Sequence, residues 1–356
     1  MIHAGLLREL LRRRATFTAY RTPGSDPVVH VQRSPALGSP VSGEEAFVIA
    51  PFNTRAQAVH CIRPDLVITG DHGPQDLEGF DGADGSDVAL GPGLDREGYR
   101  AAVVRAVEEL RSGSLDKVVL ARTIEADLQG VDIAGLFLAA VAQHPEAFVA
   151  LVHTPTYGTW LCATPERLLL VRDDLVEVDA IAGTQLYAAA PANAEAWGAK
   201  ERREQELVTN HVRETLAHAQ VGSLHTEGPI VKRAGNLAHL HSRITGRAAH
   251  RDVLGLAAAL HPTPAVGGAP RARALQLIQE LEPIHRSLYA GYWGPMGRNG
   301  TNFFVNIRCM QVDGDRALLH VGAGITSDSD PERECDEVEQ KARLWLDLIE
   351  AQRRAG

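Results

Sequence analysis

The stretch LDKVVLARTIEADL, residues 115–128, contains the feature on which both the fold and the candidate site depend. Lys117 stands at the start of an apolar run that is typical of a buried strand. A charged amine is costly to bury unless it has a partner or a chemical role. The residues further along the chain indicate which role this lysine has.

Composition and charge narrow the range of functions. The chain has 356 residues, of which 44% are hydrophobic and 23% charged, which is ordinary for a soluble globular protein. Its formal net charge of −9 disfavours nucleic acid as a partner, because phosphate binding needs a basic face. No apolar run approaches the roughly 20 residues of a membrane-spanning helix. The four cysteines are scattered singly, without the pairing of a metal site, and fit a reducing cytoplasm.

The order of the expected elements indicates one α+β body. Before residue 95, an amphipathic helix is followed by short apolar segments and by loops rich in Gly, Pro and Asp. Helical spacing of apolar residues predicts helices from Asp95 to Gly113, from Ala194 to Ala219 and from Pro331 to Arg353. Strand patterns fill the intervals. No linker of low complexity divides residues 1–356, so we expect a single catalytic domain.

Four glutamates are placed in two pairs on two of these helices. Glu201 and Glu204 are three residues apart, as are Glu334 and Glu337, and residues at this spacing share a helix face. Two such pairs could hold Mg²⁺, which prefers oxygen ligands and keeps several waters. The alternative is that both faces are solvated and paired with neighbouring arginines, and spacing alone favours this alternative.

Two further segments suggest ligand contacts without proving them. Arg308 lies in NFFVNIRCMQV, residues 302–312, an expected apolar strand in which a cation needs either an internal partner or a ligand carboxylate. Gly322 and Gly324 stand between a strand and the last helix. They predict either a turn whose backbone N–H groups approach an anion or a plain tight turn.

Single residues elsewhere leave similar alternatives. Glu166 follows a proline and precedes an apolar run, so it is either a carboxyl with a raised pKa near the interior or an ordinary charge at a strand start. His239 has the pattern of a core histidine more often than of a catalyst. Gly183 and Thr184 end an expected strand, where a tight turn explains them as well as a binding site.

The ordered occurrence of nine segments is more specific than any one of them. From about Leu115 onward the chain contains KVVLAR, TPERLL, IAGT, KERREQELV, LHPTPAVGGAP, LYAGYWG, IRCMQV, GAGIT and ERECDEVEQKA. In this set it resembles the chorismate-utilising enzymes related to anthranilate synthase component I, and within them the isochorismate synthases. The resemblance is carried by residues 96–356, whereas residues 1–95 match loosely. It implies a fold of layered, antiparallel-rich sheets with helices outside.

The resemblance assigns the central chemistry to Lys117 and Glu166. The family displaces the C4 hydroxyl of chorismate by a nucleophile that enters at C2, and a lysine at position 117 is typical of members that use water. By this resemblance Lys117 is the general base towards water and Glu166 the general acid towards the departing hydroxyl. A lysine acts as a base only when neutral and a glutamate as an acid only when protonated. Both therefore need one shielded pocket that favours the uncharged form.

The remaining positions are implied by the same resemblance. One carboxylate of chorismate is held through Mg²⁺ and the other by cationic groups, hydroxyls and backbone N–H groups. Glu204 and Glu337 are expected as direct Mg²⁺ ligands, with Glu201 and Glu334 acting directly or through water. His239 is expected beside the substrate as a catalytic residue. The expected substrate contacts are Gly183, Thr184, Ala265, Tyr289, Arg308, Gly322, Ala323, Gly324 and Lys341.

The function implied is that of an Mg²⁺-dependent isochorismate synthase, and two alternatives stay open. Ala265 resembles the branch that stops at isochorismate, whereas relatives that continue to salicylate tend to carry a hydroxyl residue there. A non-catalytic chorismate-binding relative is the other alternative, because residues 185–187 (Gln-Leu-Tyr) and Gln205 depart from the family pattern. We expect a cytoplasmic monomer that takes chorismate as its small-molecule substrate and needs no glutaminase subunit.

Overall fold

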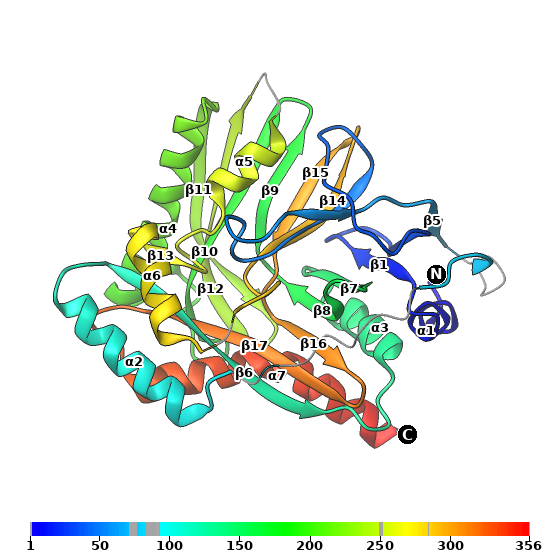
Figure 1. The fold of residues 1–356 in the computed structure, drawn as a ribbon. Helices are drawn as coiled ribbons and strands as arrows, with labels where there is room; N and C mark the ends of the chain where they lie inside the picture. Colours follow the sequence, from blue (N-terminus) through cyan, green and yellow to red (C-terminus); the bar gives the residue numbers. More distant parts are fainter. Residues whose placement is uncertain are drawn as a thin grey trace.

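The computed structural model describes residues 2–70, 77–82, 91, 93–248, 252–283 and 285–355. Within these ranges the chain forms two antiparallel sheets that pack face to face, with helices on their outer sides (Figure 1). The layered α+β fold expected from the sequence is therefore confirmed. In the same ranges, no helix is both long and apolar enough to cross a membrane.

The first sheet contains Lys117 and has nine strands among the described residues. In spatial order they are β13 (Gly268–Ala269), β6 (Lys117–Asp127), β17 (Arg316–Ile325), β16 (Cys309–Asp313), β8 (Gly158–Thr164), β7 (Phe148–Thr154), β1 (Thr16–Arg21), β2 (Val28–Gln32) and β5 (Leu66–Thr69). The apolar run after Lys117 forms the long strand β6, which pairs with β17 along its length.

The second sheet has eight strands in the described part of the chain. They follow one another as β11 (Gly222–Ala234), β12 (Leu237–Arg247), β10 (Leu175–Leu186), β9 (Arg167–Arg172), β15 (Gly300–Val305), β14 (Tyr292–Gly297), β3 (Ala46–Ala50) and β4 (His60–Ile62). Strands from the first 70 residues thus extend both sheets.

Helices cover the outer faces of the sheets and carry the acidic pairs (Figure 1). α4 packs on β10 and β12, whereas α2 and α7 pack on β6 and β17. The described helices are α1 (Ala4–Arg12), α2 (Arg96–Arg111), α3 (Ile133–Gln143), α4 (Ala199–His218), α5 (Val253–Leu260), α6 (Arg271–Leu281) and α7 (Pro331–Ala355).

The helix expected from Ala194 begins five residues late. Residues 194–196 form one 3₁₀ turn, and Trp197 follows with an extended backbone. The Trp197 ring is buried with Ala194, Ala238 and Leu240 in a small apolar cluster separate from the main core. This packing holds the segment on β12 and delays the start of α4 to Ala199.

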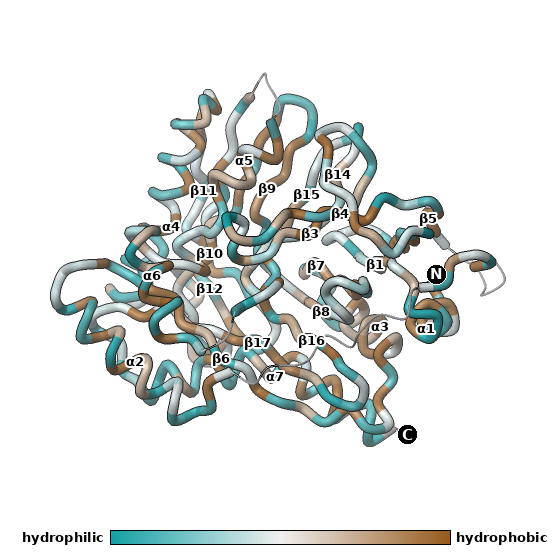
Figure 2. Tube along the Cα trace, viewed as in Figure 1, coloured by the Kyte–Doolittle hydropathy of each residue, from teal (hydrophilic) through white to brown (hydrophobic). Residues whose placement is uncertain are grey.

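The main core lies between the two sheets and is apolar, as the brown interior of the tube indicates (Figure 2). Phe148 of β7 stacks on Phe304 of β15 with ring centroids 4.3 Å apart, which joins one sheet to the other. Tyr20 of β1 and Phe47 of β3 also join the two sheets, with tilted rings whose centroids lie 5.2 Å apart. The four cysteines are buried and free. Burial of apolar area on this scale stabilises the fold without cross-links.

Candidate active site

Two of the places at which the chain passes from one sheet to the other lie next to each other. The segment of Glu166 joins β8 of the first sheet to β9 of the second, and the segment of Arg308 joins β15 to β16. The two crossings are hydrogen-bonded to each other. The backbone N–H of Val305 donates to the carbonyl of Glu166 at 3.0 Å, and that of Ala163 donates to the carbonyl of Arg308 at 3.1 Å. These bonds fix Glu166 and Arg308 close together between the sheets.

The single strand expected over residues 302–312 is therefore wrong. It is two strands, β15 and β16, that belong to different sheets. The break falls at Arg308, whose positive φ of 51° turns the chain from one sheet towards the other. A non-glycine residue rarely adopts this conformation, and surrounding structure must hold it there. The turn directs the Arg308 side chain into the space between the crossings instead of leaving it in a sheet.

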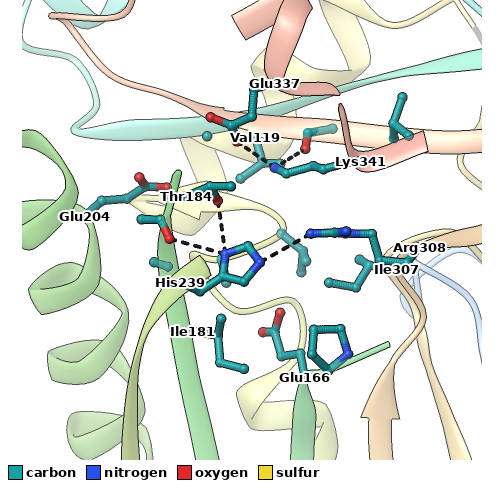
Figure 3. A pocket seen from close by; sticks show the side chains of 18 of the residues that line it. Val119, Glu166, Ile181, Thr184, Glu204, His239, Ile307, Arg308, Glu337 and Lys341 are labelled. Atoms are coloured by element: carbon teal, nitrogen blue, oxygen red, sulfur yellow. Dashed lines mark hydrogen bonds and ion pairs between the residues drawn. The ribbon is translucent and has the colours of Figure 1, made fainter. Parts of the chain in front are cut away.

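A cavity opens where the two crossings meet the ends of β6, β10, β12 and β17 and the helices α4 and α7 (Figure 3). Thirteen of the sixteen expected site residues line it. They are Lys117, Glu166, Gly183, Thr184, Glu204, His239, Ala265, Tyr289, Arg308, Gly322, Gly324, Glu337 and Lys341. The other three do not: Ala323 is buried in the core, Glu201 lies against the backbone of Gly198, and Glu334 is bound to Lys200.

Lys117 is the first residue of β6, and only 1% of it is exposed. Its Nζ lies 2.7 Å from Oε1 of Glu204 on α4, so the buried cation has an anionic partner. Gly324 makes room for this pair, because a Cβ there would collide with both side chains. Gly324 lies inside β17, opposite Val119, so the turn expected at Gly322 and Gly324 is wrong. The two glycines allow close approach within a strand.

Glu166 faces the same cavity and is 4% exposed. Burial, reinforced by the negative charge of Asp179, raises the pKa of Glu166 to about 8, although nearby lysines act in the opposite direction. The carboxyl therefore carries a proton at neutral pH, which is the state that a general acid needs. A buried amine and a protonated carboxyl thus share one shielded cavity.

His239 on β12 is hydrogen-bonded on both sides of its ring (Figure 3). Its Nδ1 lies 3.2 Å from the carbonyl oxygen of Gly183 and 3.1 Å from Oγ1 of Thr184. Its Nε2 lies 3.2 Å from Nη2 of Arg308. A guanidinium can only donate, so Nε2 accepts and Nδ1 carries the proton. Burial and the charge of Arg308 hold the pKa of His239 well below its ordinary value, so this neutral ring orients Arg308 at the cavity wall.

Gln205, one of the departures noted in the sequence, anchors α4 to the second sheet. Its side chain is buried, and its Nε2 donates to the carbonyl of Ala180 on β10 at 2.9 Å and to Oγ of Ser242 on β12 at 3.1 Å. These bonds fix the turn of α4 that carries the neighbouring Glu204. The glutamine therefore has a defined structural role here.

The chain contains only four lysines, and all of them act on carboxyl groups of this region. Lys232 of β11 acts by its charge on Glu166 and on Asp179. The other three form ion pairs with N···O distances of 2.7 Å: Lys117–Glu204, Lys200–Glu334 and Lys341–Glu337. Each expected metal ligand except Glu201 is thus neutralised by its own lysine.

Comparison with known proteins identifies the family of the chain. Residues 66–347 match the profile of the family described as chorismate binding enzyme. The chain belongs to this family. The resemblance found in the sequence is therefore confirmed, and the cavity lies within the matched part of this chorismate-binding family member.

Sequence relatives and a solved structure refine this placement. A protein of Mycobacterium tuberculosis H37Rv, named as an isochorismate synthase MenF, is 36% identical over 74% of this chain and 75% of its own length. The salicylate biosynthesis isochorismate synthase of Pseudomonas aeruginosa is 32% identical over 72% of this chain and 56% of its own. The structure of MenF, the menaquinone-specific isochorismate synthase from Escherichia coli, matches with a TM-score of 0.77 over 94% of this chain and 88% of that one. At 23% identity, this match shows the shared fold.

The carboxylates on the acidic side of this cavity are the type of ligand that a hard divalent cation binds. Glu334 is 2% exposed, and its Oε2 has no hydrogen-bond partner among the described residues. Burial and the like charge of Glu337 raise the pKa of Glu334, against the opposing charge of its partner Lys200. In the described part of the chain, no three acidic or other metal-ligating side chains are arranged to hold an ion. The carboxylates point to lysines instead and would have to turn to bind Mg²⁺.

Several cavity residues were not expected from the sequence. The clearest is His320, which is stacked between Trp160 at 5.0 Å and Tyr289 at 5.5 Å between ring centroids. Strand alternation could have pointed to it, because it stands two residues before Gly322 on the same strand. The others are mostly apolar and have no signal of their own. All the unexpected lining residues are Val119, Pro165, Ile181, Ala182, Val266, Ile307, His320 and Val321.

Proposed function

We propose that this protein is an isochorismate synthase, which converts chorismate to isochorismate by adding water at C2 as the C4 hydroxyl leaves. The observation that carries the proposal is that a buried amine, Lys117, and a protonated carboxyl, Glu166, line the same cavity. Membership of the chorismate-binding family and relatives named as isochorismate synthases support the choice of substrate and reaction.

In this proposal Lys117 and Glu166 move one proton each. Neutral Lys117 takes a proton from the attacking water as the C2–O bond forms. The ring double bonds shift, the C4–O bond breaks, and Glu166 gives its proton to the departing hydroxyl, which leaves as water. One water enters and one leaves, so the product is an isomer of the substrate. Each of these two proton transfers contributes about 10²–10⁴-fold in typical enzymes.

The other lining residues would hold the substrate. Arg308 and Tyr289 would bind the enolpyruvyl carboxylate, since a guanidinium and a phenol both donate hydrogen bonds to a carboxylate. Lys341 would lie near the ring carboxylate. The backbone from Gly322 to Gly324 would hold the same enolpyruvyl carboxylate, and Gly183 and Thr184 would line the ring pocket. The neutral His239 would keep Arg308 in place.

Mg²⁺ would be held by Glu204 and Glu337, with Glu334 and Glu201 acting directly or through water. When bound, the ion would neutralise a substrate carboxylate and fix its orientation. In the structure, however, the carboxylate of Glu204 is bound to the Lys117 amine, with Oε1 2.7 Å from Nζ. We therefore infer that Glu204 turns away from Lys117 before that amine accepts a proton.

The product spectrum tests the proposal. Purified protein is incubated with chorismate and MgCl₂, and the products are separated by chromatography, with a parallel sample in EDTA and another with ammonium chloride. We expect isochorismate that requires Mg²⁺ and no anthranilate from ammonium. Chorismate that stabilises the protein in a thermal-shift assay but is not consumed would contradict the proposal and indicate a non-catalytic relative.

A salicylate synthase is the second candidate, because one sequence relative is named for salicylate biosynthesis. The same incubation distinguishes the two, since salicylate formation releases pyruvate from isochorismate. Ala265 lines the cavity at the position where a hydroxyl residue is expected in salicylate-forming relatives. We expect no pyruvate in a coupled lactate dehydrogenase assay. Stoichiometric pyruvate with salicylate would favour the second candidate.

A further inference from the structure

A buried acid–imidazole pair lies behind the cavity wall and has no part in the mechanism proposed above. Asp179 on β10 and His241 on β12 are 5% and 4% exposed. Nε2 of His241 donates a hydrogen bond to Oδ1 of Asp179 at 2.9 Å, since an ionised carboxylate can only accept. Burying a carboxylate costs free energy even when it is paired, so the place of this pair in the fold is informative.

Strand register places the pair on the cavity side of the second sheet. Ile181 lies directly opposite His241, and Asp179 lies directly opposite Arg243. Side chains of directly opposed residues share a sheet face, as do those two positions apart on one strand. Ile181 lines the cavity beside Glu166 (Figure 3). Asp179 and His241 are therefore on the side of the sheet that faces Glu166.

The two acids have unequal surroundings. Burial by itself raises the pKa of Asp179, but the hydrogen bond and charge of His241, together with Lys232 and Arg167, lower it overall. Arg243 adds a further cation, with Nε 4.0 Å from Oδ1 of Asp179. The groups that oppose proton retention by Glu166 are Lys117 of β6, Lys232 of β11 and Lys341 of α7. The remaining acid of this face, Glu177, is itself bound to Arg167 and Arg243.

We propose that Asp179, held ionised by His241, is a positioning residue for the proton of Glu166, because its fixed negative charge on the same side of the sheet adds to burial in keeping Glu166 protonated. Two carboxyl groups in one buried region do not both ionise at low cost. The one with donors becomes the anion, and the other keeps its proton. The inference rests on the proposed role of Glu166 as general acid and adds a residue that helps to keep this acid protonated.

The Asp179→Asn variant tests this, because it removes the charge and keeps the shape. Protein labelled with ¹³C at the glutamate side-chain carboxyls is titrated by NMR, and Glu166→Gln assigns the signal of Glu166. We expect the titration midpoint of Glu166 to fall by about one pH unit in the variant. The high-pH limb of the turnover profile should move in the same direction. Asp174→Asn, an exposed acid at the β9–β10 turn, is the matched control and should leave the midpoint unchanged.

Each outcome separates the inference from the proposed function. An unchanged Glu166 midpoint in folded Asp179→Asn would overturn the inference, and so would an equal shift in Asp174→Asn. If Asp179→Asn does not fold, the double variant Asp179→Asn/His241→Gln replaces it, because two amides can hydrogen-bond to each other. Its midpoint should shift in the same direction, and an unchanged midpoint would overturn the inference. A shifted midpoint in a protein that does not consume chorismate would support the inference while the proposed function fails.

Discussion

The two sides of the cavity carry the same functional group in opposite states. On one side, burial and Asp179 raise the pKa of Glu166, and no ion pair to it is found among the described residues. On the other side, burial would also raise the pKa of Glu204, but Lys117 at 2.7 Å outweighs burial and lowers it. The contrast teaches that neighbouring charge, and not residue type or burial alone, decides where the protons are.

Glu166 and Glu204 stand on different kinds of structural element. Glu166 stands on a crossing between sheets, where its backbone carbonyl accepts a hydrogen bond from Val305. Glu204 stands on α4, whose contact with the sheet brings it to the start of β6. Substitutions on each side of the cavity and the pH dependence of turnover test this contrast.

Removing Lys117 should have the largest effect. Lys117→Ala removes both the base and the counter-charge of Glu204, so we expect the turnover of chorismate to fall about 10²–10⁴-fold, with affinity for chorismate changed little. Lys117→Arg keeps the positive charge but does not release a proton at these pH values, so it should be equally inactive. Steady-state kinetics and a binding titration measure the two effects. Near-normal turnover in either variant would remove Lys117 from the mechanism, and exposed Arg100→Ala is the control.

The pH dependence of turnover should follow the protonation of Glu166. Its raised pKa of about 8 means that the acid is protonated below that pH and loses its proton above it. We therefore expect kcat to fall about tenfold for each pH unit above roughly 8, as for loss of one essential proton. A kcat profile from pH 6 to pH 10 with Mg²⁺ in excess measures this. A profile that stays flat to pH 10 would show that Glu166 is not the proton donor.

Changing Glu337 should weaken the acidic side of the cavity alone. Glu337→Gln removes one carboxylate oxygen charge, and we expect the Mg²⁺ concentration for half-maximal activity to rise about tenfold. Calorimetric titration with Mg²⁺ measures the same loss without substrate. Glu332→Gln on the exposed face of α7 is the matched control. An unchanged Mg²⁺ titration would exclude Glu337 from the metal site.

The smallest expected effect is on thermal stability. The pKa of Glu166 is raised on folding, so its contribution to stability is fully present below about pH 4 and is lost as pH rises to about 8. In Glu166→Gln the side chain does not titrate, so the variant has no such pH-dependent loss of stability. We expect the Tm of the wild type to fall relative to that of the variant by a few degrees between pH 5 and pH 8, and then to run parallel. A constant difference in Tm would contradict the raised pKa, and Glu206→Gln on α4 is the exposed control.

The family and the layered fold could be predicted from the sequence because nine motifs recur in a fixed order. The same motifs brought most of the expected residues to one cavity. The Ala323 side chain lies outside the cavity for a local reason. It stands between Gly322 and Gly324, and alternation along β17 puts its side chain into the core while its neighbours face the cavity.

Other features depend on contacts that periodicity does not contain. The break at Arg308 arises because β15 and β16 belong to different sheets. The uninterrupted apolar pattern of this segment gives no sign of it. The pairing of Lys200 with Glu334 joins residues 134 positions apart, and that of Asp179 with His241 joins residues 62 apart. Such pairs are decided by the packing of α4, α7 and the second sheet, and no local signal in the chain reports them.

The gathering of all four lysines at one site has a practical consequence for handling the protein. Reagents that modify primary amines, such as the active esters used to attach proteins to sensor surfaces or dyes, have no lysine elsewhere on the chain to react with. Lys117 is almost fully covered, whereas Lys200 and Lys232 are partly exposed. Apart from the N-terminal amine, amine coupling would therefore attach the linker beside the acidic wall of the cavity, and immobilisation through an added affinity tag is the better choice.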